Sequence, residues 1–183
     1  MNYADIKKID VANGPGVRVS IFVSGCNHHC KNCFNQETWD FNYGKEFTEE
    51  TIEEIIDALK PSHIKGLTLL GGEPLESVNQ QGLLPLVKKV KEIYPDKSIW
   101  CYTGFLFDRD VIGKMYKNQY TRDLFSYIDV LVDGPFIEEL KNPSLRFKGS
   151  SNQRTINIPE TLKNIEFEND KYFITKENIN LLF

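Results

Sequence analysis

Three of the four cysteines lie close together in the segment SGCNHHCKNC. Cys26, Cys30 and Cys33 have the spacing C-x3-C-x2-C, and a loop this tight can wrap three thiolates around one metal centre. Two kinds of centre fit these residue types. One is a Cys3His zinc site with His28 or His29 as the fourth ligand, and the other is a [4Fe–4S] cluster held by cysteine thiolates.

The spacing favours the cluster. Zinc sites usually take pairs of ligands from separated segments, whereas every candidate here lies in one short loop and no second Cys-x-x-Cys follows. Three cysteines leave one iron without a protein ligand, and an open coordination position is typical of a catalytic site. Phe22, Phe34 and Trp39 flank the loop and could shield the centre from water. We expect His28 and His29 to be polar neighbours rather than ligands.

The elements that must position this loop alternate between β-rich and helical runs. Helices are predicted after the N-cap Thr48 and before Pro61, over 83–94 with Pro85 in the first turn, and over 108–128 in one or two pieces. Strands are predicted over 17–24, 67–70, 98–102, 128–132 and 154–158. This alternation predicts an α/β fold with a parallel sheet, either doubly wound or an incomplete barrel.

The unusual residues follow the predicted strands directly. The cysteine loop, the Gly71–Pro74 turn, Tyr102–Gly104 and Asp133–Gly134 each come after one strand. Because the C-terminal ends of parallel strands carry the site in α/β folds, we expect these four loops to meet. Cys101 falls inside a strand, where we expect a small buried residue.

The composition bounds the class of protein. The 183 residues, 40% of them hydrophobic, suit one domain, and the net charge of −4 with a pI near 5.5 does not favour nucleic-acid binding. No apolar stretch is long enough for a membrane span, and the N-terminus lacks the layout of a signal peptide. We therefore expect a cytoplasmic protein that binds no membrane, in which clustered cysteines are metal or redox groups.

The cysteine spacing after a first strand resembles the signature of the radical S-adenosylmethionine (SAM) superfamily, and Gly71–Pro74 resembles its GGE motif. The resemblance implies a [4Fe–4S] cluster on the three cysteines and SAM at the open iron. It also implies reductive cleavage of SAM to methionine and a 5'-deoxyadenosyl radical. Many members carry an aromatic residue just before the third cysteine, whereas this chain has Asn32 there and Phe34 after it.

Further segments resemble the activases of glycyl-radical enzymes, in particular the activating proteins of anaerobic (class III) ribonucleotide reductases. They are NGPGVR, CKNCFN, VLVDGPF and LRFKGSSNQR. The resemblance runs from about Tyr3 to about Ile158 and implies a radical SAM domain over 1–158, built as a partial TIM-like barrel of parallel strands with outer helices. Residues 159–183 are expected to form a C-terminal extension that does not fold independently.

The resemblance also implies a reaction and two partners. An activase of this kind abstracts hydrogen from a glycine near the C-terminus of the reductase catalytic subunit, leaves a glycyl radical there, and so supports deoxyribonucleotide synthesis. An electron donor such as flavodoxin would reduce the cluster. Alternatives are an activase of another glycyl-radical enzyme, of the pyruvate formate-lyase type, and a non-catalytic zinc-binding interaction module.

Site residues follow from the same resemblance. Cys26, Cys30 and Cys33 would be the catalytic and metal-binding residues, and Glu73 would hold the amino group of SAM. Tyr102 is a further candidate for contacting SAM or the glycine loop, and Arg18 and residues 150–154 are candidates for docking the partner. The residues implied for cofactor binding lie in the cysteine loop or at strand ends: Asn32, Cys33, Phe34, Gly71, Gly72, Glu73, Thr103 and Asp133.

Overall fold

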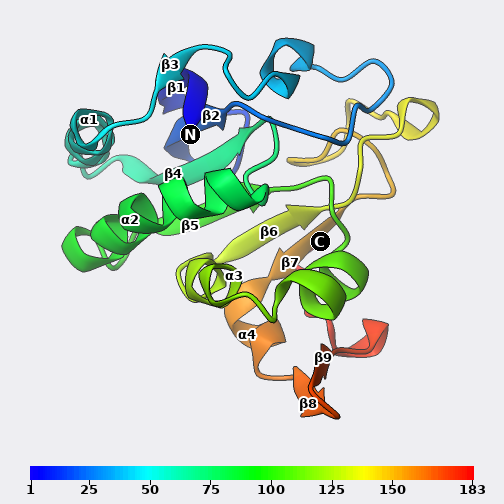
Figure 1. The fold of residues 1–183 in the computed structure, drawn as a ribbon. Coiled ribbons are helices and arrows are strands. Elements are labelled where there is room, and N and C mark those ends of the chain that lie inside the picture. Colours follow the sequence, from blue (N-terminus) through cyan, green and yellow to red (C-terminus); the bar gives the residue numbers. More distant parts are fainter.

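Seven strands form one sheet, in the order β3-β1-β2-β4-β5-β6-β7 (Figure 1). This computed structural model describes all 183 residues. The strands are β1 (Asn2–Asp10), β2 (Val17–Val23), β3 (Lys45–Glu46), β4 (Ile64–Gly71), β5 (Ser98–Tyr102), β6 (Val130–Asp133) and β7 (Arg154–Asn157).

The sheet is parallel only at its centre. β2, β4, β5 and β6 are parallel neighbours, whereas β1 pairs antiparallel with both β2 and β3, and β7 pairs antiparallel with β6. The α/β prediction is therefore confirmed, but the expectation of parallel strands throughout is wrong at both edges. β7 reverses because it follows β6 through a loop without a long crossover helix.

Helices precede β4, β5 and β6 in the chain and so connect the parallel strands, whereas α4 follows β7. The longer ones are α1 (Glu49–Leu59), α2 (Ser77–Ile93), the π-helix η2 (Phe107–Met115), α3 (Gln119–Phe125) and α4 (Ile158–Leu162). Short 3-10 turns are η1 (Gln36–Trp39), η3 (Glu138–Leu140) and η4 (Lys176–Asn178). Across the structure, the helices fall short of the length and apolarity that a membrane crossing requires.

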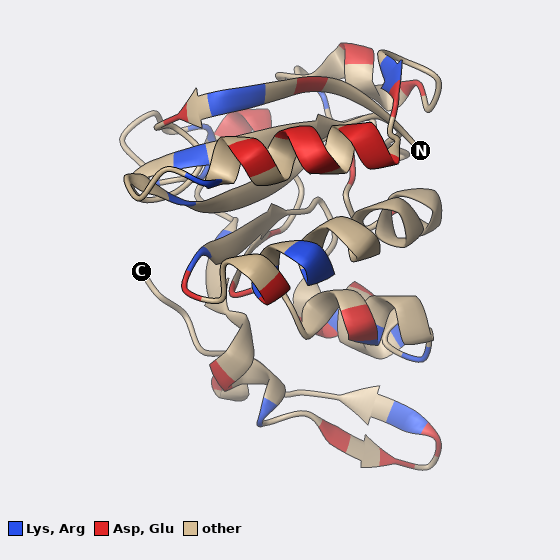
Figure 2. Cartoon of the chain, turned by 90° about the vertical axis from the view of Figure 1, so that its left-hand side faces the viewer, with Lys and Arg blue, Asp and Glu red and all other residues tan.

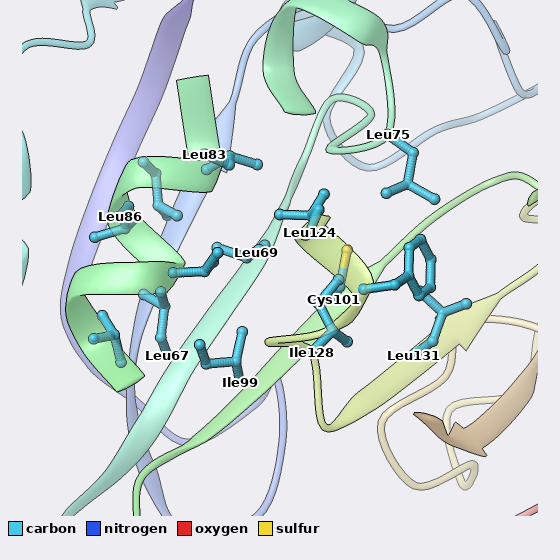
Figure 3. Packing of buried hydrophobic residues seen from close by; sticks show 14 of the residues in the cluster. Leu67, Leu69, Leu75, Leu83, Leu86, Ile99, Cys101, Leu124, Ile128 and Leu131 are labelled. Atoms are coloured by element: carbon cyan, nitrogen blue, oxygen red, sulfur yellow. The ribbon is translucent and has the colours of Figure 1, made fainter. Parts of the chain in front are cut away.

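One face of the sheet carries the main hydrophobic core. Alternate residues of the parallel strands, such as Leu67, Leu69 and Ile99, pack with Leu83 and Leu86 of α2 (Figure 3). Cys101 is fully buried in this same cluster, which confirms the prediction of a small core residue there. Since successive strand residues face opposite ways, the other residues of these strands form a second face without helices.

That second face is mixed in character. Trp100, Val130 and Val132 form a small apolar cluster on it with Tyr102 and Phe147 packed alongside. Tyr102 and Phe147 also line a cavity on this face.

Helix α1 lies where the sequence predicts it. Thr48 precedes the helix, and its backbone N–H donates to the Thr51 hydroxyl at 3.2 Å. The apolar stripe Ile52, Ile55, Ile56 and Leu59 is buried. The outward face is acidic, which Figure 2 shows as a run of red along the helix.

Helix α2 begins six residues earlier than predicted, at Ser77 instead of position 83. Pro85 therefore lies inside the helix and not in its first turn. The early turns were hidden in the sequence because they bury amides and not apolar groups. The Asn79 amide donates to the carbonyls of Ser24 and Glu73, and the Gln80 amide donates to that of Leu75.

The C-terminal segment packs onto the same core. Its hairpin, β8 (Glu166–Glu168) and β9 (Lys171–Phe173), lies against η2, and Tyr172 is edge-on to Tyr116 at 5.1 Å. Beyond the hairpin, Ile179 is buried in the main cluster. The chain then runs beside β7, where the Leu182 N–H donates to the Thr155 carbonyl at 2.9 Å.

Candidate active site

A cavity of about 620 Å³ opens at the C-terminal ends of the parallel strands. Its lining includes the three clustered cysteines, residues 71–73, residues 102–104 and Gly134. The four loops that the sequence places after strands therefore do meet. Phe22 and Trp39 also line the cavity.

All four cysteines are free thiols. Cys26 is buried, and Cys30 and Cys33 are partly exposed. In the chain alone, burial raises the pKa of the Cys26 thiol to about 12 and raises that of Cys30 as well. Ligation as thiolates would therefore release protons and depend on the charge of the bound centre.

The donor set fits a cluster better than a single ion. No three His, Cys, Asp or Glu side chains converge closely enough to hold one metal ion, as a Cys3His zinc site would require. The irons of a [4Fe–4S] cluster each take one thiolate, so the ligands of a cluster stand farther apart. Cys101 cannot complete the set, because it lies in the core on the other face of the sheet.

Gly71 and Gly72 let the turn after β4 press against the loop after β2. A Cβ on Gly71, whose φ is +106°, would lie 2.7 Å from the Phe22 backbone. A Cβ on Gly72 would lie 2.7 Å from the Gly25 carbonyl oxygen. The turn is locked there by the N–H of Gly72, which donates to the Val23 carbonyl at 2.7 Å. The two glycines thus fix the GGE turn against the cysteine loop.

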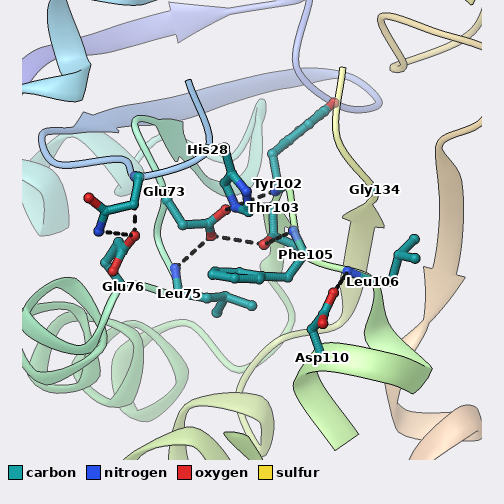
Figure 4. Close-up of polar contacts among 12 residues, drawn as sticks. His28, Glu73, Leu75, Glu76, Tyr102, Thr103, Phe105, Leu106, Asp110 and Gly134 are labelled. Atoms are coloured by element: carbon teal, nitrogen blue, oxygen red, sulfur yellow. Dashed lines mark hydrogen bonds and ion pairs between the residues drawn. The ribbon is translucent and has the colours of Figure 1, made fainter. Parts of the chain in front are cut away.

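Glu73 is 1% exposed and lies at the centre of a hydrogen-bond network (Figure 4). Its Oε1 accepts from the Leu75 N–H and the Thr103 hydroxyl, both at 2.8 Å. Its Oε2 accepts from the Gly104 N–H and lies 2.8 Å from Nε2 of His28. This one carboxylate therefore links the loops that follow β2, β4 and β5.

His28 is held on three sides. Its ring is edge-on to Phe105 at 4.4 Å, and it covers the α-carbon of Gly104 so closely that a Cβ there would lie 2.6 Å from it. Its hydrogen bond to Glu73 raises the pKa of the imidazole. The expectation that His28 is a polar neighbour agrees with this placement, but its bond to Glu73 could not be predicted from the residues around it.

Asn32 and Phe34 differ in their relation to the cavity. Asn32 is exposed, adopts a left-handed conformation with φ 55°, and does not line the cavity. Because Asn tolerates this backbone better than an aromatic residue, the local turn accounts for its presence before Cys33. Phe34 does line the cavity, is 65% exposed, and packs against Phe136 at 5.2 Å.

The strand-end candidates are also unequal. Thr103 lines the cavity, but its hydroxyl already donates to Glu73 and accepts from the Phe105 N–H at 3.1 Å. Asp133 is fully buried and does not line the cavity, and its carboxylate is bound by the Phe107 N–H and by Arg154. Tyr102 lines the cavity, and its buried hydroxyl has no partner.

The residues proposed for docking a partner point inward. Arg18 is fully buried; its guanidinium donates to the Thr68 hydroxyl and the carbonyls of Leu67 and Ser98, and burial lowers its pKa to about 10. Gln153 joins the loop after β6 to residues 149 and 150. Of these candidates only Gln153 lines the cavity, and only Ser151 is exposed.

Sequence reasoning missed the wall formed by the segment after β6. Figure 2 shows acidic residues concentrated on α1, whereas the cations that line the cavity are Lys7, Lys141 and Lys148. The only signal was the unusual LRFKGSSNQR segment, which gave no indication of what it faces. The residues of this wall are Phe136, Lys141, Asn142, Pro143, Leu145, Phe147, Lys148, Gly149 and Gln153.

Known proteins are similar to this chain in sequence. Residues 12–156, which include all three clustered cysteines, match the family model described as a 4Fe-4S single cluster domain. Over 155 residues the chain is 47% identical to the anaerobic ribonucleoside-triphosphate reductase-activating protein of Haemophilus influenzae, covering 84% of this chain and 96% of that protein. The chain belongs to this family of activating proteins.

Other members of the family are similar over the same extent. Identity is 41% to the activating protein of Escherichia coli K12, which covers 84% of this chain and 96% of the relative. It is 41% to that of Enterobacteria phage T4, which covers 84% of this chain and 92% of the relative. The aligned length matches nearly all of these activating proteins but leaves part of the present chain unmatched.

Proposed function

We propose that this protein activates an anaerobic ribonucleoside-triphosphate reductase by generating a glycyl radical on its catalytic subunit. The observation that carries the proposal is the single cavity shared by three free cysteines and the GGE turn, in a chain of this family. A [4Fe–4S] cluster bound there would supply the electron that cleaves SAM to methionine and a 5'-deoxyadenosyl radical.

The chain's own residues would bind and orient these groups. We assign the cluster to Cys26, Cys30 and Cys33, which leaves one iron open for SAM. We assign the methionine part of SAM to the backbone of the Gly71–Glu73 turn. Phe34 supplies an apolar cavity surface for the rest of the molecule, and Thr103 supports the turn. Asp133 is assigned a positioning role, since its carboxylate is already bound within the chain.

The partner's glycine segment would enter over the face of the sheet that has no helices. We propose that this sheet is an incomplete TIM-like barrel, because its parallel strands follow chain order and their helices cover one face. The domain would span residues 1–158, with 159–183 as an extension that depends on it for folding. An unclosed barrel leaves room for a peptide segment, which a closed barrel would exclude.

A reductant must also reach the cluster. Lys7, Lys141 and Lys148 line the cavity beside the cysteine loop and place positive charge there, whereas Lys31 is paired with Glu139. An acidic electron donor such as flavodoxin would be drawn to this charge.

The test begins with anaerobic reconstitution of the protein with iron and sulfide. After reduction and addition of SAM, we expect 5'-deoxyadenosine to form. Cys26→Ala should lose iron and cleavage, whereas Cys101→Ser, a change of a core cysteine away from the cavity, should keep both. Stoichiometric zinc with no cleavage of SAM would contradict the proposal and favour a zinc-binding interaction module.

A second measurement identifies the partner. The reduced protein is mixed with SAM and either an anaerobic ribonucleotide reductase or pyruvate formate-lyase, and electron paramagnetic resonance is recorded. We expect the doublet of a glycyl radical only with the reductase. A radical only on the lyase would transfer the proposal to the other class of activase.

A further inference from the structure

We propose that His28 and Glu73 form a positioning pair that holds the cysteine loop in the shape required for cluster binding. The inference rests on the proposed assignment of Cys26, Cys30 and Cys33 to the cluster. It gives Glu73 a role other than the SAM contact that the GGE motif suggests, and it gives His28 a role in the site.

The carboxylate of Glu73 has no free acceptor position. A carboxylate offers about four acceptor sites, and four donors of this chain occupy them: His28 Nε2, Leu75 N, Thr103 Oγ1 and Gly104 N, each at 2.8 Å. No Lys or Arg side chain bonds it. A cationic ligand group would have to displace one of these donors, so the carboxylate is built to hold the protein's own loops.

His28 is the only one of these four donors that comes from the cysteine loop. It sits between Cys26 and Cys30, and its ring is confined by Phe105 and Gly104. The bond to Glu73 therefore fixes the loop at a point between two of the assigned cluster ligands. The other three donors hold Glu73 itself in place, which gives His28 a rigid acceptor.

A second tie acts next to the first. The side-chain amide of Asn27 donates to Oε1 of Glu76 at 2.9 Å, and its backbone N–H donates to the same oxygen at 3.2 Å. Two successive residues of the cysteine loop, Asn27 and His28, are thus bonded to two carboxylates of the segment after β4, those of Glu76 and Glu73. Because the Asn27 contact is exposed, we expect the buried His28 contact to contribute more.

The neighbouring His29 offers a matched control. It is exposed, has φ 48°, and packs against Trp39 at 4.6 Å, with no hydrogen bond from its side chain. His29→Gln replaces a histidine of the same loop, as His28→Gln does, but it removes no hydrogen bond to another loop.

The first test uses the full chain without a cluster. Hydrogen exchange is measured over residues 26–33 in the wild type and in His28→Leu, His28→Gln and His29→Gln. Loss of a hydrogen bond to a charged group should speed exchange in His28→Leu by about tenfold or more. The Gln side chain places a donor near the position of Nε2, so His28→Gln and His29→Gln should stay within about threefold of the wild type.

The second test uses the reconstituted protein. Iron loss to a chelator is timed, and the paramagnetic resonance spectrum of the reduced cluster is recorded with and without SAM. His28→Leu should lose iron several-fold faster and show a changed spectrum, and His28→Gln should restore both. The proposal would be overturned if His28→Leu exchanged its amides and retained iron as the wild type does. It would also be overturned if His28→Gln behaved like His28→Leu.

The two proposals can fail separately. If the wild type binds no iron or does not cleave SAM, the proposed function fails, while the exchange data on the cluster-free chain still decide whether His28 holds the loop. If the wild type cleaves SAM and His28→Leu is indistinguishable from it in both tests, only the positioning pair fails.

Discussion

Arg154 at the start of β7 bonds the fully buried carboxylate of Asp133 at the end of β6. The same guanidinium lies 2.6 Å from a carboxylate oxygen of Asp108. The Asp133 carboxylate also accepts a hydrogen bond from the Phe107 N–H at 2.8 Å. These bonds join the last two strands of the sheet to the beginning of η2. They lie directly behind Gly134, which lines the cavity.

Removal of the Arg154 guanidinium should leave Asp133 buried without a counter-charge. We expect Arg154→Met to lower the free energy of unfolding by about 3–5 kcal/mol, measured by denaturant titration. Lys163→Met breaks an exposed pair with Glu160 and should cost no more than about 1 kcal/mol. Equal losses in the two variants would show that the buried pair of Arg154 and Asp133 contributes no more to stability than an exposed pair.

The hydrogen bonds of Asp110 should make the free energy of unfolding fall in acid. Burial opposes its ionisation, but hydrogen bonds from Arg109, Lys114 and the Leu106 N–H outweigh burial and hold the pKa of Asp110 well below its ordinary value of 3.8. Because the pKa of Asp110 is lower in the folded chain than in the unfolded chain, its ionisation stabilises the fold at a pH above the unfolded-state pKa. This stabilisation is lost as the pH falls from the unfolded-state pKa towards the folded-state pKa.

The matching measurement is the difference in unfolding free energy between the wild type and Asp110→Asn as a function of pH. We expect the difference to be constant above about pH 5 and to shrink as the pH falls from about 4 towards 2. A difference that does not change over this range would mean that Asp110 titrates normally in the folded chain.

Gly104 should tolerate no side chain. Because its Cβ would lie 2.6 Å from the His28 ring, Gly104→Ala should displace the ring from Glu73 and cost about 1–3 kcal/mol of unfolding free energy. Gly113→Ala is the control, since its Cβ would meet nothing closer than 3.4 Å, and it should change stability by no more than about 1 kcal/mol. Thermal or denaturant unfolding separates the two.

Ile179 tests whether the C-terminal extension belongs to the same folding unit. It is 7% exposed in the main core, so Ile179→Ala should cost about 2–5 kcal/mol in a single unfolding transition. Leu181→Ala removes a side chain that is 55% exposed and should cost less than about 0.5 kcal/mol. A separate early transition in Ile179→Ala would indicate an extension that folds by itself.

The predictable parts of the fold are those with a simple apolar pattern. Helix α1 has a stripe at helical spacing behind Thr48, and β2 is a run of β-branched residues. β1 was missed because most of its side chains are polar and only partly buried. The first turns of α2 were missed because Asn79 and Gln80 are buried for their amides, which a hydrophobic pattern does not register.

In the site, too, features with a local sequence pattern could be predicted, and contacts between distant residues could not. The spacing of Cys26, Cys30 and Cys33 and the Gly71-Gly72 turn identified loops that do meet. The bond between His28 and Glu73 joins residues 45 positions apart, and nothing local to either residue announces it. Asn32 was unexpected before the third cysteine until its left-handed backbone gave a reason for it.

The segment that runs beside β7 also affects how the protein behaves at high concentration. The N–H of Asn157 donates to the carbonyl of Asn180, and Leu182 donates to Thr155, so the backbone groups along this border of the sheet are already paired. The opposite edge is β1, which β3 covers only at Asn2 and Tyr3. The rest of β1 carries Lys7 and Lys8, and its pairing with β2 is irregular at two places. Because charged side chains and bulges discourage the addition of another strand, the native chain should resist edge-to-edge aggregation.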